Sequence, residues 1–185
     1  ESELLHRELV ENSITLLKNS GDIFPIKNLE SKKIAYVKLG DSNHKDFVEM
    51  LRNYTQVDAI TSTSLDDLIT KLEPYNLVVI GFHKSNESPW KSYKFKDVEL
   101  VWLQEIARKK NVILNIFASP YSMLKMKSFE NIEGLLLSYQ NSKISQQISA
   151  QMIFGAMETK GNIPVSIHSV FPEGSGLISK PLKRL

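Results

Sequence analysis

Short polar segments follow four apolar stretches of this sequence and hold most of the side chains that could bind or transform a ligand. In an open sheet of parallel strands, ligands bind outside the carboxyl ends of the strands, so these segments are the first place to look for a site. The candidates are Gly40, Asp41, Ser42, Asn43 and His44, then His83, Lys84, Ser85, Asn86 and Glu87, then Ser119, Pro120 and Tyr121, and finally Gln140 and Asn141.

Most signatures of proteins with such a sheet are absent from these segments. No G-x-G-x-x-G and no P-loop follows a predicted strand, which argues against a dinucleotide or nucleotide site. The segment GDSNHKD has one glycine and one serine, too few for a flavin phosphate loop, and Phe82 and His83 stand where a phosphoryl-accepting receiver carries an acid. The four histidines lack metal-ligand spacing and the chain has no cysteine, so we expect no cofactor and no metal.

The long polar segment after His83 contains one acid, Glu87, and two aromatic residues, Trp90 and Tyr93. Hydrolysis of a glycosidic bond requires two carboxylates on either side of the bond, and no second inward-facing acid is evident. Glu87 is therefore a weak candidate for an acid/base. Trp90 and Tyr93 could stack on a sugar ring or simply pin the segment to the body of the protein.

The composition of the chain is that of a single globular domain. It has 185 residues, of which 42% are hydrophobic, and 23 basic residues against 21 acidic ones give a net charge of +2. This balance argues against binding to nucleic acid or to an anionic membrane. No apolar run approaches the roughly 20 residues of a membrane span, and the chain shows no signal peptide, which a fragment of a longer protein would have lost.

Hydrophobic periodicity predicts helices that alternate with strands. We expect helices at 3–19, 41–54, 64–73, 97–110 and 142–157, and strands at 33–40, 57–61, 77–82, 112–117, 134–139 and 163–168, the last with Pro164 at an edge or a start. Strands that alternate with helices form a parallel sheet covered on both faces. The predicted fold is therefore α/β: a doubly wound, mostly parallel, flavodoxin-like sheet of five to six strands with helices on both faces.

The end of the sequence differs from the rest in composition. Residues 171–185 contain two prolines and two glycines and show little periodicity. We therefore divide the chain into one domain at 1–170 and an extended linker or surface strap at 171–185.

Three segments, taken in order, resemble the C-terminal α/β sandwich domain of family 3 glycoside hydrolases. The first, ENSITLLKNSGDIFPIK, matches a helix end with the pattern S-x-x-L-L-K-N that leads into an L-P-L turn. The second, NVILNIFASPYSM, matches a strand that ends in a Gly/Ser-x-P turn at Ser119–Tyr121. The third, IFGAMETKGNIPVSIH, matches a closing G-x-x-x-x-x-G-x-L-P-V-S segment. The resemblance covers residues 1–168.

The resemblance implies that the chain is the second domain of an enzyme whose first domain, a (β/α)₈ barrel, carries the aspartate nucleophile. In many members a glutamate after the third strand of the second domain is the acid/base, and Glu87 lies in that region. The residues around Glu87 lack the family's acidic run followed by Arg and a Leu-rich stretch. That difference favours the β-N-acetylglucosaminidase branch, whose Asp-His acid/base pair is on the barrel.

The resemblance also implies the partners and the compartment. The partners would be the barrel of the same polypeptide, a carbohydrate substrate and, as the tail resembles the connector of some bacterial members, a following serine hydrolase domain. A bacterial protein that is periplasmic or exported is favoured, with the cytoplasm as the alternative. The alternative to the enzyme domain is a free-standing flavodoxin-like module that binds a ligand or a protein.

We therefore expect an accessory domain of a retaining exo-glycosidase that acts on terminal β-N-acetylglucosaminides or β-glucosides, inactive when isolated. Residues expected to shape the pocket rim or contact substrate are Asp41, Asn43, His83, Lys84, Trp90, Ser119 and Tyr121. The expected apolar contacts to the barrel are the first helix and Trp90, Tyr93, Tyr121 and Met123.

Overall fold

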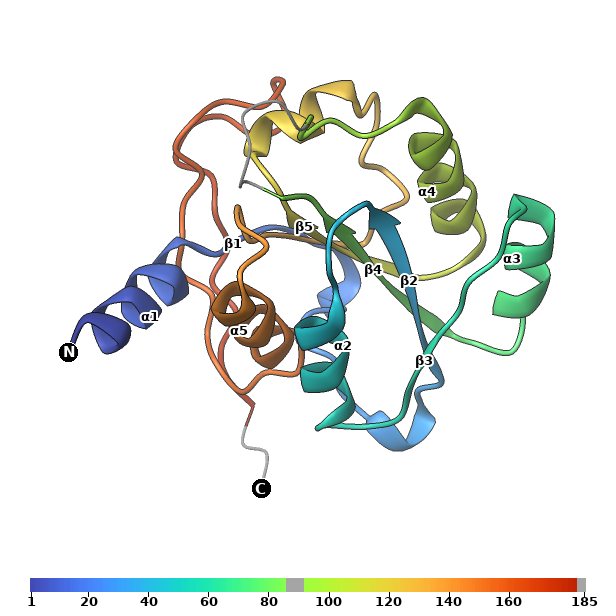
Figure 1. The fold of residues 1–185 in the computed structure, drawn as a ribbon, viewed down its shortest axis with the longest axis horizontal. Coiled ribbons are helices and arrows are strands. Elements are labelled where there is room, and N and C mark those ends of the chain that lie inside the picture. The colour runs from blue at the N-terminus through green and yellow to red at the C-terminus, as the bar shows by residue number, and fades with distance from the viewer. Residues whose placement is uncertain (86–91, 183–185) are drawn as a thin grey trace.

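The computed structural model describes residues 1–85 and 92–182, and these residues contain one six-stranded sheet (Figure 1). The strands are β1 (Thr15–Asn19), β2 (Ile34–Gly40), β3 (Val57–Ala59), β4 (Leu77–His83), β5 (Val112–Phe117) and β6 (Gly134–Leu137). The spatial order is β1-β6-β5-β4-β2-β3, with β1 antiparallel to β6 and all other pairs parallel. The five parallel strands, counted in chain order, therefore have the flavodoxin-like order 2-1-3-4-5, which confirms the predicted fold class.

Helices cover both faces of the sheet (Figure 1). They are α1 (Ser2–Ser13), α2 (Lys45–Arg52), α3 (Leu65–Leu72), α4 (Asp97–Lys109) and α5 (Lys143–Ile153), with 3-10 turns at Ser20–Asp22, Leu29–Ser31 and Pro120–Lys125. Buried leucines of α3 and α4 belong to the hydrophobic core of one face, whereas buried residues of α1, α2 and α5 belong to the core of the other. None of these helices, within the described residues, combines the length and the hydropathy that crossing a membrane requires.

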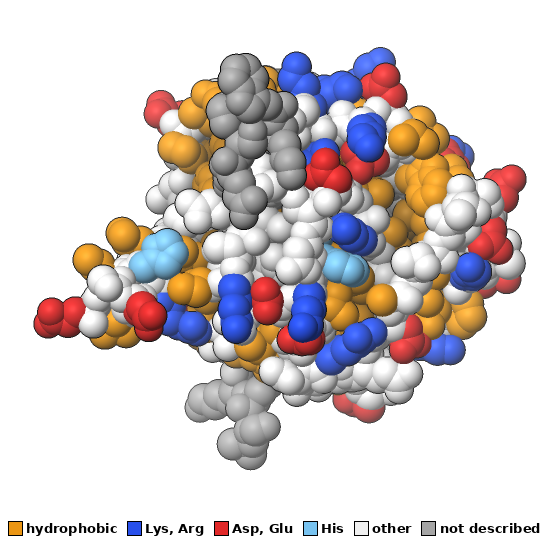
Figure 2. Space-filling model, in the orientation of Figure 1, with side chains coloured by type: hydrophobic (Ala, Val, Ile, Leu, Met, Phe, Trp, Pro, Cys, Tyr) orange, Lys and Arg blue, Asp and Glu red, His pale blue; other side chains and the backbone are white. Residues whose placement is uncertain are grey.

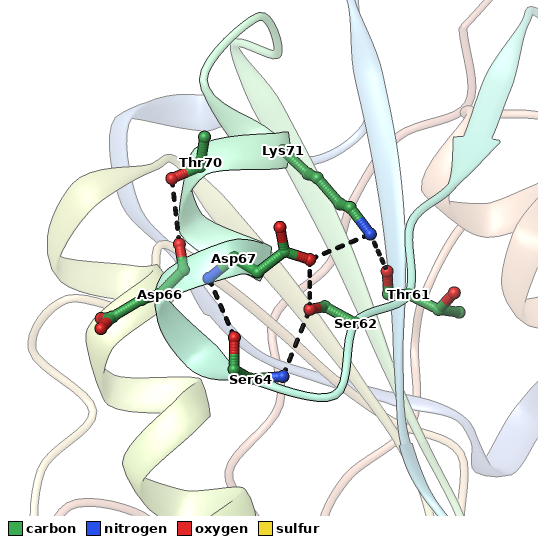
Figure 3. Close-up of polar contacts among 7 residues, drawn as sticks. All are labelled: Thr61, Ser62, Ser64, Asp66, Asp67, Thr70 and Lys71. Carbon is green, nitrogen blue, oxygen red and sulfur yellow. Dashed lines mark hydrogen bonds and ion pairs between the residues drawn. The ribbon is translucent and has the colours of Figure 1, made fainter.

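The start of α3 shows how local sequence fixes an element. The Ser64 hydroxyl accepts a hydrogen bond from the backbone N–H of Asp67 at 3.2 Å and so caps the start of the helix predicted at 64–73. The carboxylate of Asp67 accepts a bond from the Ser62 hydroxyl at 2.5 Å and is paired with Lys71 at 3.0 Å (Figure 3). The Ser62 bond is the main reason why the pKa of Asp67 is lowered.

The prediction of one helix over residues 3–19 was wrong in its second half. The helix α1 ends at Ser13, and Thr15–Asn19 form β1, which pairs with β6 through Thr15 and Leu137. The apolar spacing of the first helix continues through Leu16 and Leu17, so periodicity alone cannot separate a helix end from a short buried strand. The outcome is decided by the tertiary structure, because Leu16 is fully buried beside β6.

The strand predicted at 163–168 was also wrong. The sixth strand of the sheet is β1. Residues 163–168 form an isolated bridge from Ile167 to Phe171 and backbone hydrogen bonds between Ile163 and both Gly174 and Ser175, and none of them joins the sheet. Pro164 has no N–H to donate, which fits a segment that does not join a ladder.

The tail from residue 171 returns along the body of the protein. The backbone N–H of Leu177 donates to the carbonyl of Leu16 at 2.8 Å, and residues Thr159 and Ser179 form a second bridge. Gly176 lies so close to Gly161 that an added Cβ would be 2.1 Å from the carbonyl oxygen of Gly161. Part of the outer edge of β1 is thereby paired by the tail.

Candidate functional site

The carboxyl ends of β2, β4 and β6 meet at one edge of the sheet and form a polar pocket. Its volume is about 730 Å³. The lining residues are Asp41, Ser42, Asn43, Asp46, Ser85, Gln140, Asn141, Ser142, Lys143 and Gln146. Of the residues expected at the pocket rim, the structure places Asp41 and Asn43 here. Four further candidates from the strand ends also line the pocket, namely Ser42, Ser85, Gln140 and Asn141.

A chain of hydrogen bonds between buried and partly buried side chains lies near this pocket. His44 Nδ1 is 3.0 Å from the hydroxyl of Tyr36, and that hydroxyl is 2.9 Å from His83 Nε2. His83 Nδ1 is 2.7 Å from the side-chain oxygen of Asn141. Tyr36 and His83 are fully buried, so this series of hydrogen bonds connects the loops after β2 and β6 through the core.

The partners of Asn141 determine which atom donates and which accepts in each of these hydrogen bonds. The Asn141 amide nitrogen donates to the carbonyl of Asn43 at 2.8 Å, and its oxygen accepts from Gln146 at 3.1 Å. The oxygen therefore also accepts from His83 Nδ1–H, and His83 Nε2 accepts from the Tyr36 hydroxyl. In this arrangement the imidazole of His83 is neutral and carries its one N–H on Nδ1. Burial is the main cause of the neutral state, because it lowers the pKa of His83 to about 3, whereas the bond to Asn141 acts in the opposite direction and raises that pKa.

Burial also shifts the two groups that complete the chain. It raises the pKa of Tyr36 strongly and lowers the pKa of His44, with Lys38 and Arg52 adding to the effect on His44. All three side chains therefore stay uncharged near neutral pH. The Tyr36 hydroxyl, which donates to His83, can accept from His44 Nδ1–H.

Gln146 of α5 holds the loops of this edge together. Its side-chain oxygen accepts from the backbone N–H of Phe47 at 2.9 Å, and its nitrogen donates to the carbonyls of Asn43 and Asn141, each at 3.0 Å. The residue is 1% exposed. A buried amide with all these bonds fixes the start of α2 relative to the start of α5.

Searches by sequence find no match: no family model and no curated protein matches the chain. Solved structures do match. A fungal multi-domain GH3 β-N-acetylglucosaminidase matches with a TM-score of 0.73 and 19% identity over 93% of this chain and 20% of that one. A family 3 β-N-acetylglucosaminidase from a Paenibacillus species gives 0.64 and 15% over 85% and 31%. A β-glucosidase from Listeria innocua gives 0.68 and 18% over 87% and 26%.

The chain has the fold of one domain of family 3 glycoside hydrolases. The match covers nearly all of this chain, and the chain spans only about a fifth to a third of each of these three solved proteins. The resemblance seen in the sequence is therefore confirmed as a structural match. At these identities the comparison establishes the fold and leaves the activity to be argued from the residues.

The other residues proposed from the sequence occupy several places in this family 3 fold. His83 lies in the core near the pocket and is not exposed. Ser119 caps the turn at Pro120–Lys125 by accepting from the N–H of Tyr121, and neither residue lines the pocket. Lys84 is buried and paired with Asp41. Glu87 and Trp90 lie outside the described residues.

The residues expected to form apolar contacts with the barrel differ in their exposure. Tyr121 and Tyr93 are 44% and 37% exposed, whereas Met123 is fully buried and belongs to the core. Among the described residues, no group of three or more histidine, aspartate or glutamate side chains could hold a metal ion. The polar pocket is lined by amide, hydroxyl and charged side chains.

Sequence reasoning missed Tyr36 and Gln146. Tyr36 lies inside a predicted strand that is otherwise mostly apolar, and Gln146 lies in the helix predicted at 142–157. A glutamine on the buried side of a helix is the one signal that could have identified the network, because buried amides require partners.

Proposed function

We propose that this chain is an accessory domain of a larger exo-glycosidase that acts on terminal β-N-acetylglucosaminides or β-glucosides. The observation that carries this proposal is the match of nearly the whole chain to one part of several glycosidases of these two specificities. In this proposal the catalytic residues are on a partner (β/α)₈ barrel domain, and the present domain contributes to the rim of the sugar pocket.

The surface of α1 supports a partner domain. Leu4, Leu5 and Leu9 are 65%, 59% and 60% exposed, and Val10 is the one residue of this helix that is buried. Apolar side chains gather along α1 where it extends from the body (Figure 2). A single domain seldom exposes so much apolar surface on one helix unless another protein surface covers it.

A groove continues this apolar surface. It has a volume of about 550 Å³ and is lined by Leu9 and Val10 of α1 together with Tyr139 and Pro164. Tyr139 and Gln140 follow β6, at the edge of the sheet that also forms the polar pocket. A barrel domain seated on α1 and this groove would therefore lie next to the polar pocket.

The polar pocket supports a role in carbohydrate binding. Asn43 and Asn141 are held by the buried network, and Ser42 and Asp41 stand beside them. Amides, hydroxyls and carboxylates are the groups that bind the hydroxyls of a sugar, and a fixed loop loses little entropy on binding. These residues are the proposed rim.

One observation favours a second candidate, a free-standing flavodoxin-like module that binds a ligand or a protein. The parallel strands have the flavodoxin-like order, and a single domain with such a sheet can bind a ligand at the carboxyl edge where the polar pocket lies. The gene separates the two candidates, because the accessory domain requires a barrel-coding region upstream of the codon for Glu1.

The α1 surface gives an experiment on the partner. The barrel domain encoded by the same gene is expressed separately and its affinity for this chain is measured by calorimetry. We expect the double variant Leu5→Glu/Leu9→Glu to lose binding by at least about tenfold, since a charge is then buried at the interface. Val98→Glu/Val101→Glu on α4, at residues 56% and 55% exposed, is the matched control and should bind normally. Equal effects of both variants would refute the proposed surface.

A further inference from the structure

Lys84 is a buried lysine that follows β4, at the point between β2 and β4 where the connecting helices switch from one face of the sheet to the other. Its backbone N–H donates to the carbonyl of Phe117 at 3.2 Å. The neighbouring strand β2 continues into α2 on one face, whereas β4 is followed by α4 on the other face. In open α/β sheets this switch point is the place where ligands bind.

The ammonium group of Lys84 is buried but has few interaction partners. Its side chain is 5% exposed, and its charge partner is the carboxylate of Asp41 at 3.6 Å, beyond hydrogen-bond distance. The ammonium also lies 5.7 Å from the centre of the Phe82 ring. Across residues 1–85 and 92–182, no acceptor lies within hydrogen-bond distance of it. A buried ammonium has three donors to satisfy, so an additional acceptor would stabilise it.

The space beside Lys84 is rich in positive charge. A pocket of about 490 Å³ is lined by Asp41, Lys84, Ser92, Lys94, Phe95, Lys96, Asp97 and Lys125. Four lysines against two aspartates leave a formal charge of +2. Lys125 is already bonded to Asp97 at 3.0 Å and to the carbonyl of Phe95 at 3.0 Å. With both aspartates paired, Lys94 and Lys96 supply the excess charge.

We propose that this pocket binds the oxyanion group of a small molecule, with Lys84 as its central contact. The group can be a phosphate, a sulfate or a carboxylate, because each presents oxygen acceptors to an ammonium. The site differs from the polar pocket of the proposed rim, although Asp41 lines both. It does not depend on the proposed role in a glycosidase.

The experiment is a titration of the purified protein with sodium phosphate, sodium sulfate and sodium acetate at constant ionic strength, followed by amide chemical shifts. Saturable shifts at residues 41 and 92–97 are expected for at least one of the three anions, and the anion that binds most tightly identifies the group. The variant Lys84→Met removes the ammonium and should abolish saturation. Lys160→Met, at an exposed lysine outside the pocket, should leave it unchanged.

A third variant is expected to strengthen anion binding instead of weakening it. Asp41→Asn removes the carboxylate that competes for Lys84, so it should tighten anion binding by about fivefold. Circular dichroism checks that each variant is folded. Shifts that do not saturate, or that survive in Lys84→Met, overturn the proposal. If Lys84→Met does not fold, unchanged or weaker binding by Asp41→Asn overturns it instead.

Discussion

The imidazole of His83 lies over the backbone of Gly81, two residues earlier on the same strand. A Cβ added at Gly81 would be 2.4 Å from His83 Nε2 and 3.0 Å from the hydroxyl of Tyr36. The ring also stacks on Phe117, with centroids 4.5 Å apart and planes 9° from parallel. Glycine at this position therefore leaves the space that the histidine needs to reach its buried partner.

The substitution Gly81→Ala tests this relationship. The methyl group would displace the imidazole and break its bond to Tyr36, and overpacking of this kind costs about 2 kcal/mol. In a His83→Ala background the same substitution should cost less than about 1 kcal/mol, because the clashing ring is gone. Urea unfolding of the four proteins in this cycle gives the coupling. Equal costs in both backgrounds would show that Gly81 does not serve His83.

The neutral state of His83 predicts a loss of stability in acid. Its pKa in the folded protein is lowered from 6.5 to about 3, mainly by burial. Between these two pH values His83 is protonated in the unfolded state and neutral in the folded state. The free energy of unfolding therefore falls as the pH falls from about 6.5 to about 3, by up to about 1.4 kcal/mol per pH unit. Above pH 6.5 the contribution is fully present.

Denaturation at several pH values, with His83→Gln as the comparison, checks this prediction. Glutamine does not titrate, so the variant should lose stability less steeply across the same range. His44, whose pKa is also lowered by burial, and carboxylates such as Asp58 and Asp67 titrate in both proteins and cancel in the difference. Parallel curves for the two proteins would contradict the assignment of a neutral, buried His83.

Gln146 should be far more sensitive than its neighbour on α5. Gln146→Ala leaves the N–H of Phe47 and the carbonyls of Asn43 and Asn141 without this partner, and losses of this kind cost about 2 kcal/mol. Gln147→Ala, on a partly exposed side chain, should change stability by less than about 0.5 kcal/mol. Thermal unfolding of both variants measures the difference. Similar midpoints would mean that the amide network is not stabilising.

The tail should protect the edge of the sheet. Removing residues 176–185 deletes the bond from Leu177 to Leu16 and the bridge from Ser179 to Thr159. Unpaired strand edges promote association, so the shortened protein should be less stable by about 2 kcal/mol and should form oligomers. Urea unfolding and light scattering test both effects. A monomer of unchanged stability would assign the tail no structural role.

The sequence was sufficient to predict the α/β class and five of the six strands. Runs such as LVVIGF and VILNIF are apolar on both faces, as strands buried in a parallel sheet must be, and Ser64 with Asp67 marks a helix start by local chemistry alone. These features depend on neighbouring residues, so a local pattern is enough to find them.

The remaining features depend on residues far apart in the sequence. Thr15–Asn19 become a strand because β6, more than 110 residues later, offers an edge. The strand ends indicated Asp41 and Asn43 correctly as neighbours at one edge. Nothing near His83 in the sequence indicates that its ring contacts Tyr36 and Asn141, since these pairs are 47 and 58 residues apart. Such pairs are set by the three-dimensional fold.

The proposed role as an accessory domain is tested most directly by hydrolysis of aryl β-N-acetylglucosaminides and aryl β-glucosides. The assay compares the purified 185-residue chain with the product of the whole gene. Because the proposal places the catalytic residues on a barrel domain, the whole product should hydrolyse one of these substrates, whereas the chain alone should match a heat-inactivated control. Hydrolysis by the chain alone, or a whole gene product that contains no barrel domain, would contradict the account.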